Sequence, residues 1–343
     1  MAESPRSLRR RRTIAGLLAF VAAAAAPACS SDGSDTLTIY SGREQSLVQP
    51  LLERFAEEEG VAIEVRYGDT AELAATLLEE GDGSPADVFF AQDAGALGAL
   101  DAAGMLQPLP RELLDLVVPR FRAADGDWIG FSGRARVVAH STDRLEAEDL
   151  PDSILDFTDP EWRGRIGWAP TNGSFQSFVT ELRQVQGEDG ARAWLESIQA
   201  NDPVSYESNI PAVLGIADGE VDVAFVNHYY LYILRQEEGE DFPVENGFMA
   251  PGDPGSLVNV AGSGILGTAD STEDAQAFIR FMLGDEAQQY FATETFEYPL
   301  ADGVPAEPEL RPLSEITPPD VPLSDLSDLP GTLELLHETG VLP

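Results

Sequence analysis

Strand-like and helix-like segments alternate along the first third of the chain, and this alternation constrains the fold more than any other feature. Short apolar runs rich in branched and aromatic residues predict strands, and apolar residues at helical spacing predict the helices between them. In chain order the segments cover residues 37–40, 46–60, 61–65, 70–80, 86–90 and 94–103. Such an alternation is typical of an open α/β sheet with parallel strands. Ligands bind these sheets beyond the carboxyl ends of the strands, which here are residues 41–44 and 91–93.

A second set of α/β segments follows in the middle of the chain. Residues 128–131 and 134–139 are predicted to be two strands on either side of a Ser132-Gly133 turn. Strand, helix, helix, helix and strand patterns then cover residues 166–168, 175–185, 190–199, 211–217 and 221–226. Residues 301–330 are rich in proline and are expected to be irregular. The chain is long enough for two domains of ordinary size.

Two tyrosines, Tyr229 and Tyr230, stand side by side after the apolar run at residues 221–226 and an Asn227-His228 turn. Adjacent phenols at the end of a strand can point into one cleft, and phenolate oxygens are hard anionic ligands. Hard ligands select hard, highly charged cations, among which Fe(III) is the obvious biological candidate. The alternative is that the two rings pack against the core, as buried aromatic residues commonly do.

The first 28 residues have the features of a secretory signal peptide. An arginine cluster at residues 9–12 precedes an apolar stretch at 14–26, which is too short for a comfortable membrane span. Cys29 follows as the only cysteine, so no intrachain disulfide can form. Its position resembles a bacterial lipobox, which predicts a lipid anchor on Cys29 and a polar tether over residues 29–36. The alternative is a free thiol, and both Sec and twin-arginine export remain open.

The chain is strongly acidic. Its 60 acidic and 21 basic residues give a formal net charge of −39, and the sequence contains no lysine. A surface of this charge excludes nucleic acid and anionic membrane surfaces as partners, so any membrane attachment is through the lipid anchor alone. Most of the charge is interpreted as a solvated acidic face, although it would also concentrate cations near a cleft.

Seven short segments, spread in order over nearly all of the chain beyond the predicted tether, resemble the periplasmic ferric-iron-binding proteins. These are the substrate-binding components of bacterial iron ABC transporters. The segment with Tyr229 and Tyr230 is the most specific of the seven. The segments are residues 37–43, 67–69, 85–89, 132–137, 170–175, 227–230 and 261–264.

The resemblance implies a type II periplasmic-binding-protein fold, in which two α/β lobes joined by crossing strands close a hinged cleft. It places residues 37–137 and 259–308 in an N-lobe and residues 138–258 and 309–343 in a C-lobe. It also implies an exported monomer that is anchored to the membrane, on the cell surface or in the periplasm, with ferric iron as cargo and a cognate ABC permease as partner.

In the family that this chain resembles, two tyrosines of the second lobe bind iron, and here they are Tyr229 and Tyr230. The first lobe supplies a His and a Glu, whose positions align with Glu44 and Gln92. Glu44 can serve as a hard carboxylate ligand, whereas Gln92 is a poor ligand for Fe(III) and leaves the neighbouring Asp93 as an alternative. Gln92 and Asp93 can instead line the cleft or cap a helix.

The resemblance also implies a small synergistic anion, phosphate or carbonate, that completes the coordination of the iron. Its contacts fall on Asn172, Gly173, Ser174, Asn209 and Asn227. Physical reasoning agrees in part, because Asn172 to Ser174 precede a predicted helix whose free N–H groups favour an anion. Some family members carry a third tyrosine in this turn, but this chain has Asn172, Gly173 and Ser174 there.

The other charged residues near these segments have simpler interpretations. Arg43, Arg134 and Arg136 are expected to make structural ion pairs, with anion binding as the alternative. His228 is expected to face away from the site, in the core or at the surface.

The sequence does not favour an enzyme. It contains no His-Glu-x-x-His, Gly-x-Ser-x-Gly or phosphate-binding Gly-Lys-Ser/Thr motif. The sequence therefore predicts a lipoprotein that captures ferric iron for an ABC permease. The main alternative is the same clamp binding an oxyanion, a sugar or an iron chelate.

Overall fold

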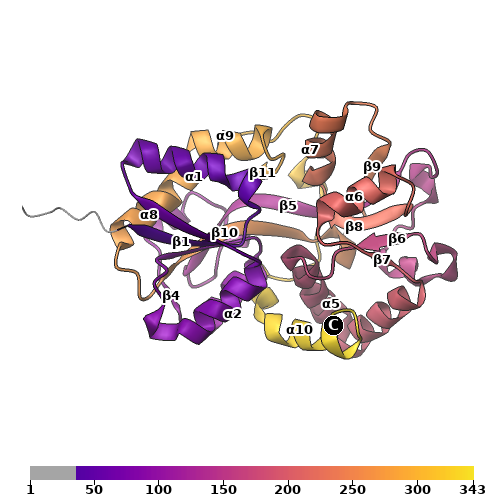
Figure 1. Ribbon diagram of the computed structural model, residues 1–343, viewed down its shortest axis with the longest axis horizontal. Helices are drawn as coiled ribbons and strands as arrows, with labels where there is room; N and C mark the ends of the chain where they lie inside the picture. The colour runs from indigo at the N-terminus through magenta and orange to yellow at the C-terminus, as the bar shows by residue number, and fades with distance from the viewer. Residues whose placement is uncertain (1–35) are drawn as a thin grey trace, which may run out of the picture. The chain divides into compact units, whose positions relative to one another are not determined.

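The computed structural model describes residues 36–343, and over that range eleven strands form one mixed sheet. The main strand order is β2-β1-β3-β10-β5-β8-β6-β7, while β4 pairs with β10, and β9 and β11 pair with β5. Figure 1 shows helices on both faces of this sheet. The predicted signal peptide and the predicted lipidation site Cys29 lie outside the described residues.

The first third of the chain forms the parallel α/β unit that its pattern predicts. Strand β1 pairs in parallel with both β2 and β3, so the carboxyl ends of all three strands lie at one edge. Strand β2 begins two residues later than the apolar run predicts. The elements are β1 Leu37–Ser41, α1 Gln45–Glu59, β2 Ile63–Tyr67, α2 Thr70–Glu80, β3 Val88–Ala91, α3 Ala94–Ala102, β4 Leu106–Gln107 and α4 Arg111–Leu114.

Strand β5, Trp128–Ser141, connects the two parts of the sheet, as Figure 1 shows. Its first half pairs with β10, Val258–Leu266, and its second half pairs with β8, Val223–Asn227. The prediction of two strands separated by a turn is therefore wrong. The chain stays extended at Ser132 and Gly133 because both residues pair with β10 on one side and with β11 on the other.

The second α/β set repeats the logic of the first. Strand β6 pairs in parallel with β7 and β8, and α5, α6 and α7 begin shortly after β6, β7 and β8 end. The two helices predicted at residues 175–199 are the halves of α5, which is interrupted at Gly187 with a φ of 73°. The elements are β6 Ile166–Trp168, α5 Gly173–Ala200, β7 Val204–Ser205, α6 Asn209–Ala217, β8, α7 Tyr229–Glu238 and β9 Val244–Gly247.

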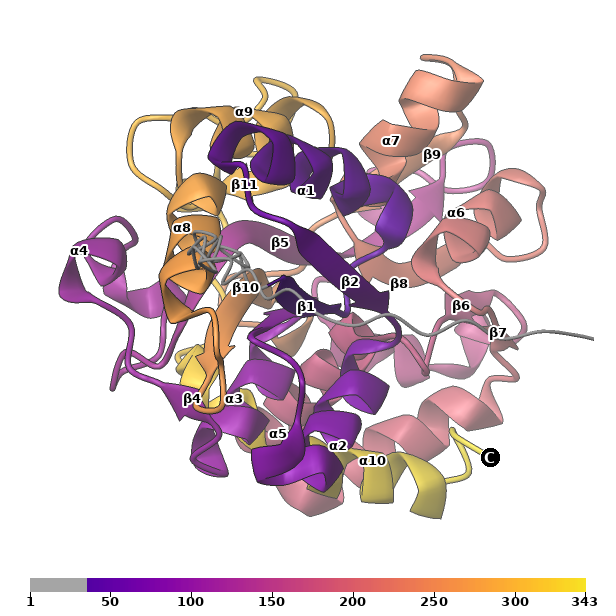
Figure 2. The same ribbon diagram turned by 60° about the vertical axis from the view of Figure 1, so that its left-hand side comes forward.

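The C-terminal third adds helices to both faces of the sheet. Figures 1 and 2 show α1, α8 and α9 on one face and α2, α5 and α10 on the other. Residues 301–328 form only bends, an isolated bridge and short 3-10 turns, as their proline content predicts. The elements are α8 Thr272–Met282, α9 Asp285–Thr293, β11 Tyr298–Pro299 and α10 Leu329–Glu338.

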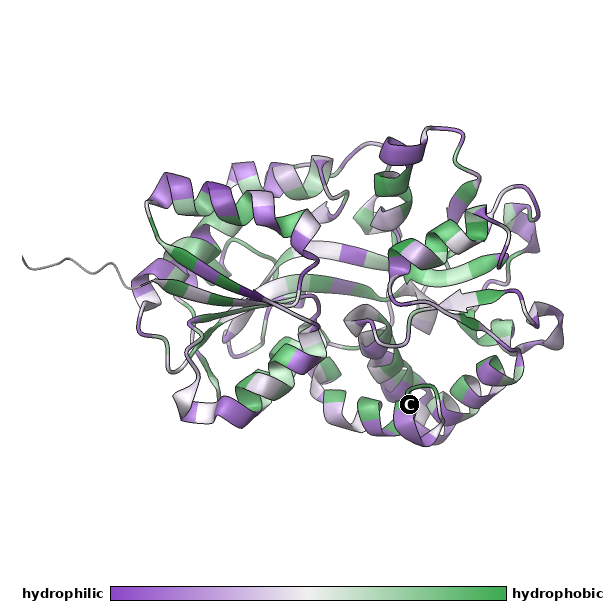
Figure 3. Ribbon diagram, in the orientation of Figure 1, coloured by the Kyte–Doolittle hydropathy of each residue, from purple (hydrophilic) through white to green (hydrophobic). Residues whose placement is uncertain are grey.

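The hydrophobic core lies between the sheet and its helices. Figure 3 shows strands that are largely hydrophobic and helices that carry hydrophobic and hydrophilic residues on different sides. Within residues 36–343, no helix is both long and apolar enough to cross a membrane. The division into an N-lobe and a C-lobe at the residues given above stays a prediction.

Candidate metal and anion site

A cleft of about 470 Å³ lies where the strands end. One wall comes from the ends of β1, β2 and β3, and the other comes from the starts of α5, α6 and α7. We call it the tyrosine cleft. Five of the predicted site residues line it together: Glu44, Gln92, Asn172, Gly173 and Tyr230. Ends of parallel strands and starts of helices thus meet at the place where α/β sheets bind ligands.

The tyrosine pair forms the first turn of α7, directly beyond the end of β8. The two ring centroids lie 4.1 Å apart, with Tyr230 on the cleft wall and Tyr229 fully buried behind it. The hydroxyl of Tyr229 has no hydrogen-bond partner among the described residues. Burial raises the pKa of Tyr229 well above its ordinary value, and the adjacent Tyr230 phenol raises it further.

Two buried guanidinium groups lie close to the tyrosines. Arg43 Nη2 donates a hydrogen bond of 2.7 Å to Glu297 Oε2, and neither side chain is exposed. Arg134 Nε lies 3.9 Å from Glu297 Oε1, and no nitrogen of the Arg134 guanidinium has a hydrogen-bond partner within residues 36–343. Two arginines facing one carboxylate leave excess positive charge beside Tyr229, and this charge opposes the rise in the pKa of Tyr229. The ion pair expected of Arg43 is therefore present.

The charges around Arg43 and its burial shift its pKa in opposite directions. Burial by itself lowers the pKa of Arg43, but the Glu297 carboxylate and the two phenols outweigh it and leave the pKa above its ordinary value. A third guanidinium, Arg136, is also buried, and burial lowers its pKa to about 10. Arg136 therefore keeps its charge at neutral pH.

Two of the predicted anion contacts, Ser174 and Asn227, are joined behind the cleft wall. Asn227 Nδ2 donates to Ser174 Oγ at 3.0 Å, and Arg136 Nη1 lies 3.5 Å from Asn227 Oδ1. Arg136 Nη2 also donates to the carbonyl of Phe225 at 3.0 Å. These bonds hold the amide and the hydroxyl next to a fixed positive charge, which suits an anion.

The first turn of α5 has the geometry of an anion-binding helix start. Asn172 caps the helix, since its Oδ1 accepts a hydrogen bond of 3.0 Å from the backbone N–H of Ser174. A Cβ atom at Gly173 would come within 2.7 Å of Asp93 Oδ2, so the close approach of these segments requires glycine. Asn209, the first residue of α6, is buried, and its Nδ2 has no partner in the described part of the chain.

Gln92 and Asp93 follow β3 but face different surroundings. Gln92 lines the cleft, where its Oε1 lies 3.5 Å from Arg43 Nη1 and its Nε2 donates to Ser174 Oγ at 3.4 Å. Asp93 is buried and caps α3, and its Oδ1 accepts a hydrogen bond of 2.8 Å from the hydroxyl of Ser177. Burial raises the pKa of Asp93, while the Ser177 hydroxyl opposes that shift. Asp93 thus has the geometry of the helix cap that was the alternative to metal binding.

The two remaining predictions concern Glu44 and His228. Glu44 is exposed on the cleft wall, at the residue before α1, with no capping hydrogen bond of its own. His228 is fully buried: its Nδ1 accepts from the backbone N–H of Ala135 at 3.2 Å, and its Nε2 lies 2.9 Å from the carbonyl of Phe296. Burial lowers the pKa of His228 to about 3, so the ring is neutral, and it connects the backbones of Ala135 and Phe296 in the core.

The cleft also contains oxygen-bearing side chains that the sequence reasoning did not select: Tyr67, Asp69, Glu72 and Glu207. Tyr67 is the last residue of β2 and Asp69 follows two residues later, so both lie at the carboxyl end of a strand, as do the residues selected at the ends of β1 and β3. Applying that rule to every strand of the first set would have found both. Glu207 precedes α6 at the opposite wall, and no local pattern marks it.

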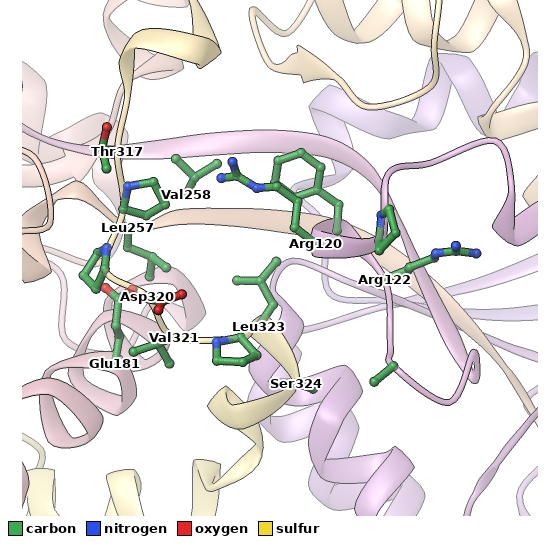
Figure 4. A pocket seen from close by; sticks show the side chains of 16 residues that line it. Arg120, Arg122, Glu181, Leu257, Val258, Thr317, Asp320, Val321, Leu323 and Ser324 are labelled. Carbon is green, nitrogen blue, oxygen red and sulfur yellow. The ribbon is translucent and has the colours of Figure 1, made fainter.

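A larger pocket, of about 830 Å³, lies elsewhere in the fold. Its lining comes from residues 119–122, 124, 257–258 and 317–324 together with Glu181, and we call it the proline pocket after Pro119, Pro318, Pro319 and Pro322. Figure 4 shows Glu181 and Asp320 toward one end and Arg122 at the other. Glu181 is buried, its Oε2 has no partner in the part of the chain described, and burial raises its pKa to about 9.

Comparison with known proteins is consistent with this architecture. Residues 83–319 match the family described as bacterial extracellular solute-binding protein. The chain is 32% identical over 330 residues to the major ferric iron-binding protein of Neisseria meningitidis, covering 95% of this chain and 97% of the relative. The chain belongs to the ferric-iron-binding periplasmic proteins of the bacterial extracellular solute-binding family. Members of this family are binding proteins, not enzymes.

Solved structures agree with the family assignment. Iron-bound HitA from Pseudomonas aeruginosa superimposes with a TM-score of 0.85 at 35% identity, covering 89% of this chain and 99% of that one. The Trichodesmium protein IdiA (FutA), solved with iron and citrate, superimposes with a TM-score of 0.74 at 26% identity over the same shares of the two chains. The fold is therefore the α/β periplasmic-binding-protein fold that the sequence predicts, and the protein is an extracytoplasmic binding protein.

Proposed function

We propose that this protein captures Fe(III) in the tyrosine cleft through the phenolates of Tyr229 and Tyr230 and hands it to an ABC permease. One observation carries the proposal: the hydroxyl of Tyr229 is buried without a hydrogen-bond partner among residues 36–343, while its ring packs on that of Tyr230 near two buried arginines. A buried unpaired hydroxyl costs stability, which is understandable if a ligand satisfies it in the loaded protein. The relatives named above bind ferric iron by their descriptions.

The other metal ligands come from the opposite wall of the cleft. Glu44 is the strongest candidate, because it is a hard carboxylate on the wall and free of competing hydrogen bonds within the described chain. Gln92 is better suited to orient Ser174 and Arg43 than to bind Fe(III). Asp93 is engaged as a helix cap and would have to give up that role to bind metal. Tyr67 and Asp69 are further oxygen donors of the same wall.

A synergistic anion, phosphate or carbonate, completes the proposed coordination. Asn172, Gly173, Ser174, Asn209 and Asn227 would hold it at the starts of α5 and α6, where free N–H groups and the helix dipole favour negative charge. The buried charge of Arg136 next to Asn227 adds to this preference. We also propose a lipid anchor at Cys29 that keeps the protein at the membrane near its permease.

A visible absorption titration tests the proposal. The mature chain, stripped of metal, is titrated with ferric citrate in phosphate or in bicarbonate buffer. We expect a saturable phenolate-to-iron charge-transfer band that disappears when Tyr229 and Tyr230 are both changed to Phe. A band that survives in the double variant contradicts the assignment of the site.

One observation favours a second candidate, an anionic ferric chelate as cargo. Gln92 stands where related proteins are expected to carry a carboxylate ligand, and Arg43, Arg134 and Arg136 lie buried around the inner wall. Gln92 beside these arginines makes the inner wall more positive than a carboxylate would, and this favours a more anionic ligand there, while the carboxylates Glu44, Asp69, Glu72 and Glu207 lie elsewhere on the lining. A chelate-selective cleft would ignore iron offered with phosphate or bicarbonate and bind it only with the chelator, which the same titration distinguishes.

A further inference from the structure

A strained turn packs against His228 and Tyr232, the residues that flank the tyrosine pair. Phe296 has a φ of 53°, the left-handed region that bulky aromatic residues rarely adopt. Such a conformation costs free energy and persists only where the surroundings hold it in place. We call residues 295–298 the 295–298 turn. It joins the end of α9 to β11.

The start of α7 holds this turn. His228 Nε2 lies 2.9 Å from the carbonyl oxygen of Phe296, and the His228 ring stacks on Tyr298 with centroids 4.7 Å apart. One helical turn further on, the Tyr232 ring stacks on Phe296 with centroids 5.6 Å apart. The residues on either side of Tyr229 and Tyr230 therefore fix the strained backbone.

The turn directs Glu297 into the core. Glu297 is fully buried; its Oε2 accepts a hydrogen bond of 2.7 Å from Arg43 Nη2 and lies 3.0 Å from the Thr295 hydroxyl. Arg134 lies 3.9 Å from the other carboxylate oxygen. Arg43 in turn lines the tyrosine cleft, reaches Gln92 at 3.5 Å, and interacts electrostatically with both phenols.

We propose that Glu297 is a positioning residue of the iron site, which the 295–298 turn holds in place so that Arg43 stays fixed against the tyrosine pair and Gln92. This inference rests on the proposed function of the cleft. Helix α7 carries the tyrosines, and its first residues also contact the turn that carries Glu297, the partner of Arg43. The turn therefore links the position of Arg43 to the position of the phenol oxygens. Partners of this kind, one layer behind the metal ligands, tune metal affinity without touching the metal.

The charge arrangement argues for positioning rather than for stability. A buried ion pair is often no more stabilising than a well-packed apolar pair, so burial of Glu297 between two arginines is weak evidence for a purely structural role. Its carboxylate also acts against phenolate formation by charge alone. Glu297 therefore favours iron binding only if the benefit of holding Arg43 in one geometry outweighs this repulsion.

The test compares iron binding by the wild-type chain and three variants, using ferric citrate in bicarbonate buffer with competing free citrate. Glu297→Gln keeps the volume and one hydrogen-bond acceptor, and Thr295→Val removes a hydroxyl that lies 3.0 Å from Glu297 Oε2 and 3.0 Å from the carbonyl oxygen of Phe291. Glu286→Gln breaks an exposed ion pair with Arg54, 3.0 Å long, as the matched control. We expect Glu297→Gln to bind iron about 10- to 100-fold more weakly, Thr295→Val to lie between it and the wild type, and the control to be unchanged.

The second readout is the position and intensity of the phenolate-to-iron band, which a merely structural residue would leave unaltered in the folded variant. Circular dichroism and thermal melting verify that each variant is folded. Equal or tighter binding by Glu297→Gln with an unaltered band overturns the positioning role while leaving the iron site intact. Absence of the band in the wild-type chain overturns the proposed function itself, so the two failures are distinguishable.

Discussion

The tyrosine cleft and the proline pocket differ in what lies beneath their surfaces. The proline pocket is the larger of the two, with about 830 Å³ against about 470 Å³. Beneath it the described chain offers one buried carboxyl, Glu181, which burial keeps protonated by raising its pKa to about 9. In and behind the walls of the cleft lie two phenols, three arginines and the Glu297 carboxylate, and four of these six side chains have a buried polar atom without a hydrogen-bond partner within residues 36–343: Tyr229, Arg43, Arg134 and Glu297.

The difference teaches that volume is a poor guide to the site in this fold. A folded protein leaves few buried polar groups unpaired, because each costs free energy. A cluster of such groups at the ends of parallel strands is therefore more informative than a larger pocket with a mixed rim. These unpaired groups lower the stability of the ligand-free protein, and a bound ligand that pairs with them would restore it.

The largest contrast is expected from Tyr229→Phe. The buried hydroxyl has no hydrogen-bond partner in the described part of the chain, so removing it should stabilise the metal-free protein by about 1–3 kcal/mol and weaken iron binding by at least about 100-fold. Urea denaturation measures the first effect and citrate competition measures the second. Tyr290→Phe is the control, because its hydroxyl donates to the carbonyl of Leu47 at 2.9 Å and the residue does not line the cleft. A Tyr229→Phe variant that is less stable and still binds iron would contradict the role of this hydroxyl as an iron ligand.

In the proline pocket the expected effect is on stability alone. Leu257→Ala removes a buried side chain and should cost about 2–5 kcal/mol of unfolding free energy. The iron affinity of the folded protein should stay within about twofold of the wild type, since Leu257 does not line the cleft. A large change in iron affinity would show that the two regions are not independent.

A smaller effect is expected where α5 meets α3. Ser177→Ala removes the 2.8 Å hydrogen bond to the buried Asp93 carboxyl and should lower the free energy of unfolding by about 1.5–3 kcal/mol. Ser197→Ala, in the same helix, removes a bond to the carbonyl of Ala193 on the exposed face and serves as the control. Denaturant curves with equal slopes compare the two variants. Equal stability of the two would mean that the Asp93 contact adds nothing beyond a surface bond.

A last effect is expected in the pH dependence of stability. The folded-state pKa of Glu181 is raised to about 9 from an ordinary value of 4.5, so the folded protein retains a proton that the unfolded chain has lost. The associated stability is fully present below pH 4.5 and is lost as the pH rises toward 9. The melting temperature of Glu181→Gln, relative to that of the wild type, should therefore be higher at pH 8 than at pH 5. The exposed Glu196→Gln should show no such trend, and a parallel trend in both variants would contradict the assignment to Glu181.

Much of this fold is legible in the sequence because each element is locally encoded. Strand runs and helical spacing locate β1 to α3 within a few residues, and the tyrosine pair follows its strand as predicted. The prediction fails at Ser132 and Gly133, where pairing with distant strands keeps a turn-like sequence extended. Tertiary pairing overrides local preference at such places.

The inner layer of the site could not be predicted in the same way. Glu297 and Arg43 are separated by 254 positions in the chain, and no local pattern indicates that they touch. The left-handed backbone at Phe296 is equally unexpected, because its residue type argues against it. The role of Asp93 could not be assigned from the sequence either, because a residue directly after a strand can bind a ligand or cap the next helix.

Resonance Raman spectroscopy of the iron-loaded mature chain, excited in its visible band, tests the central claim most directly. The account predicts enhanced ring modes of iron-bound tyrosinate in the wild-type protein, diminished in each single Tyr→Phe variant at 229 or 230 and absent from the double variant. Iron bound tightly without tyrosinate modes would contradict the claim that these two phenolates hold the metal.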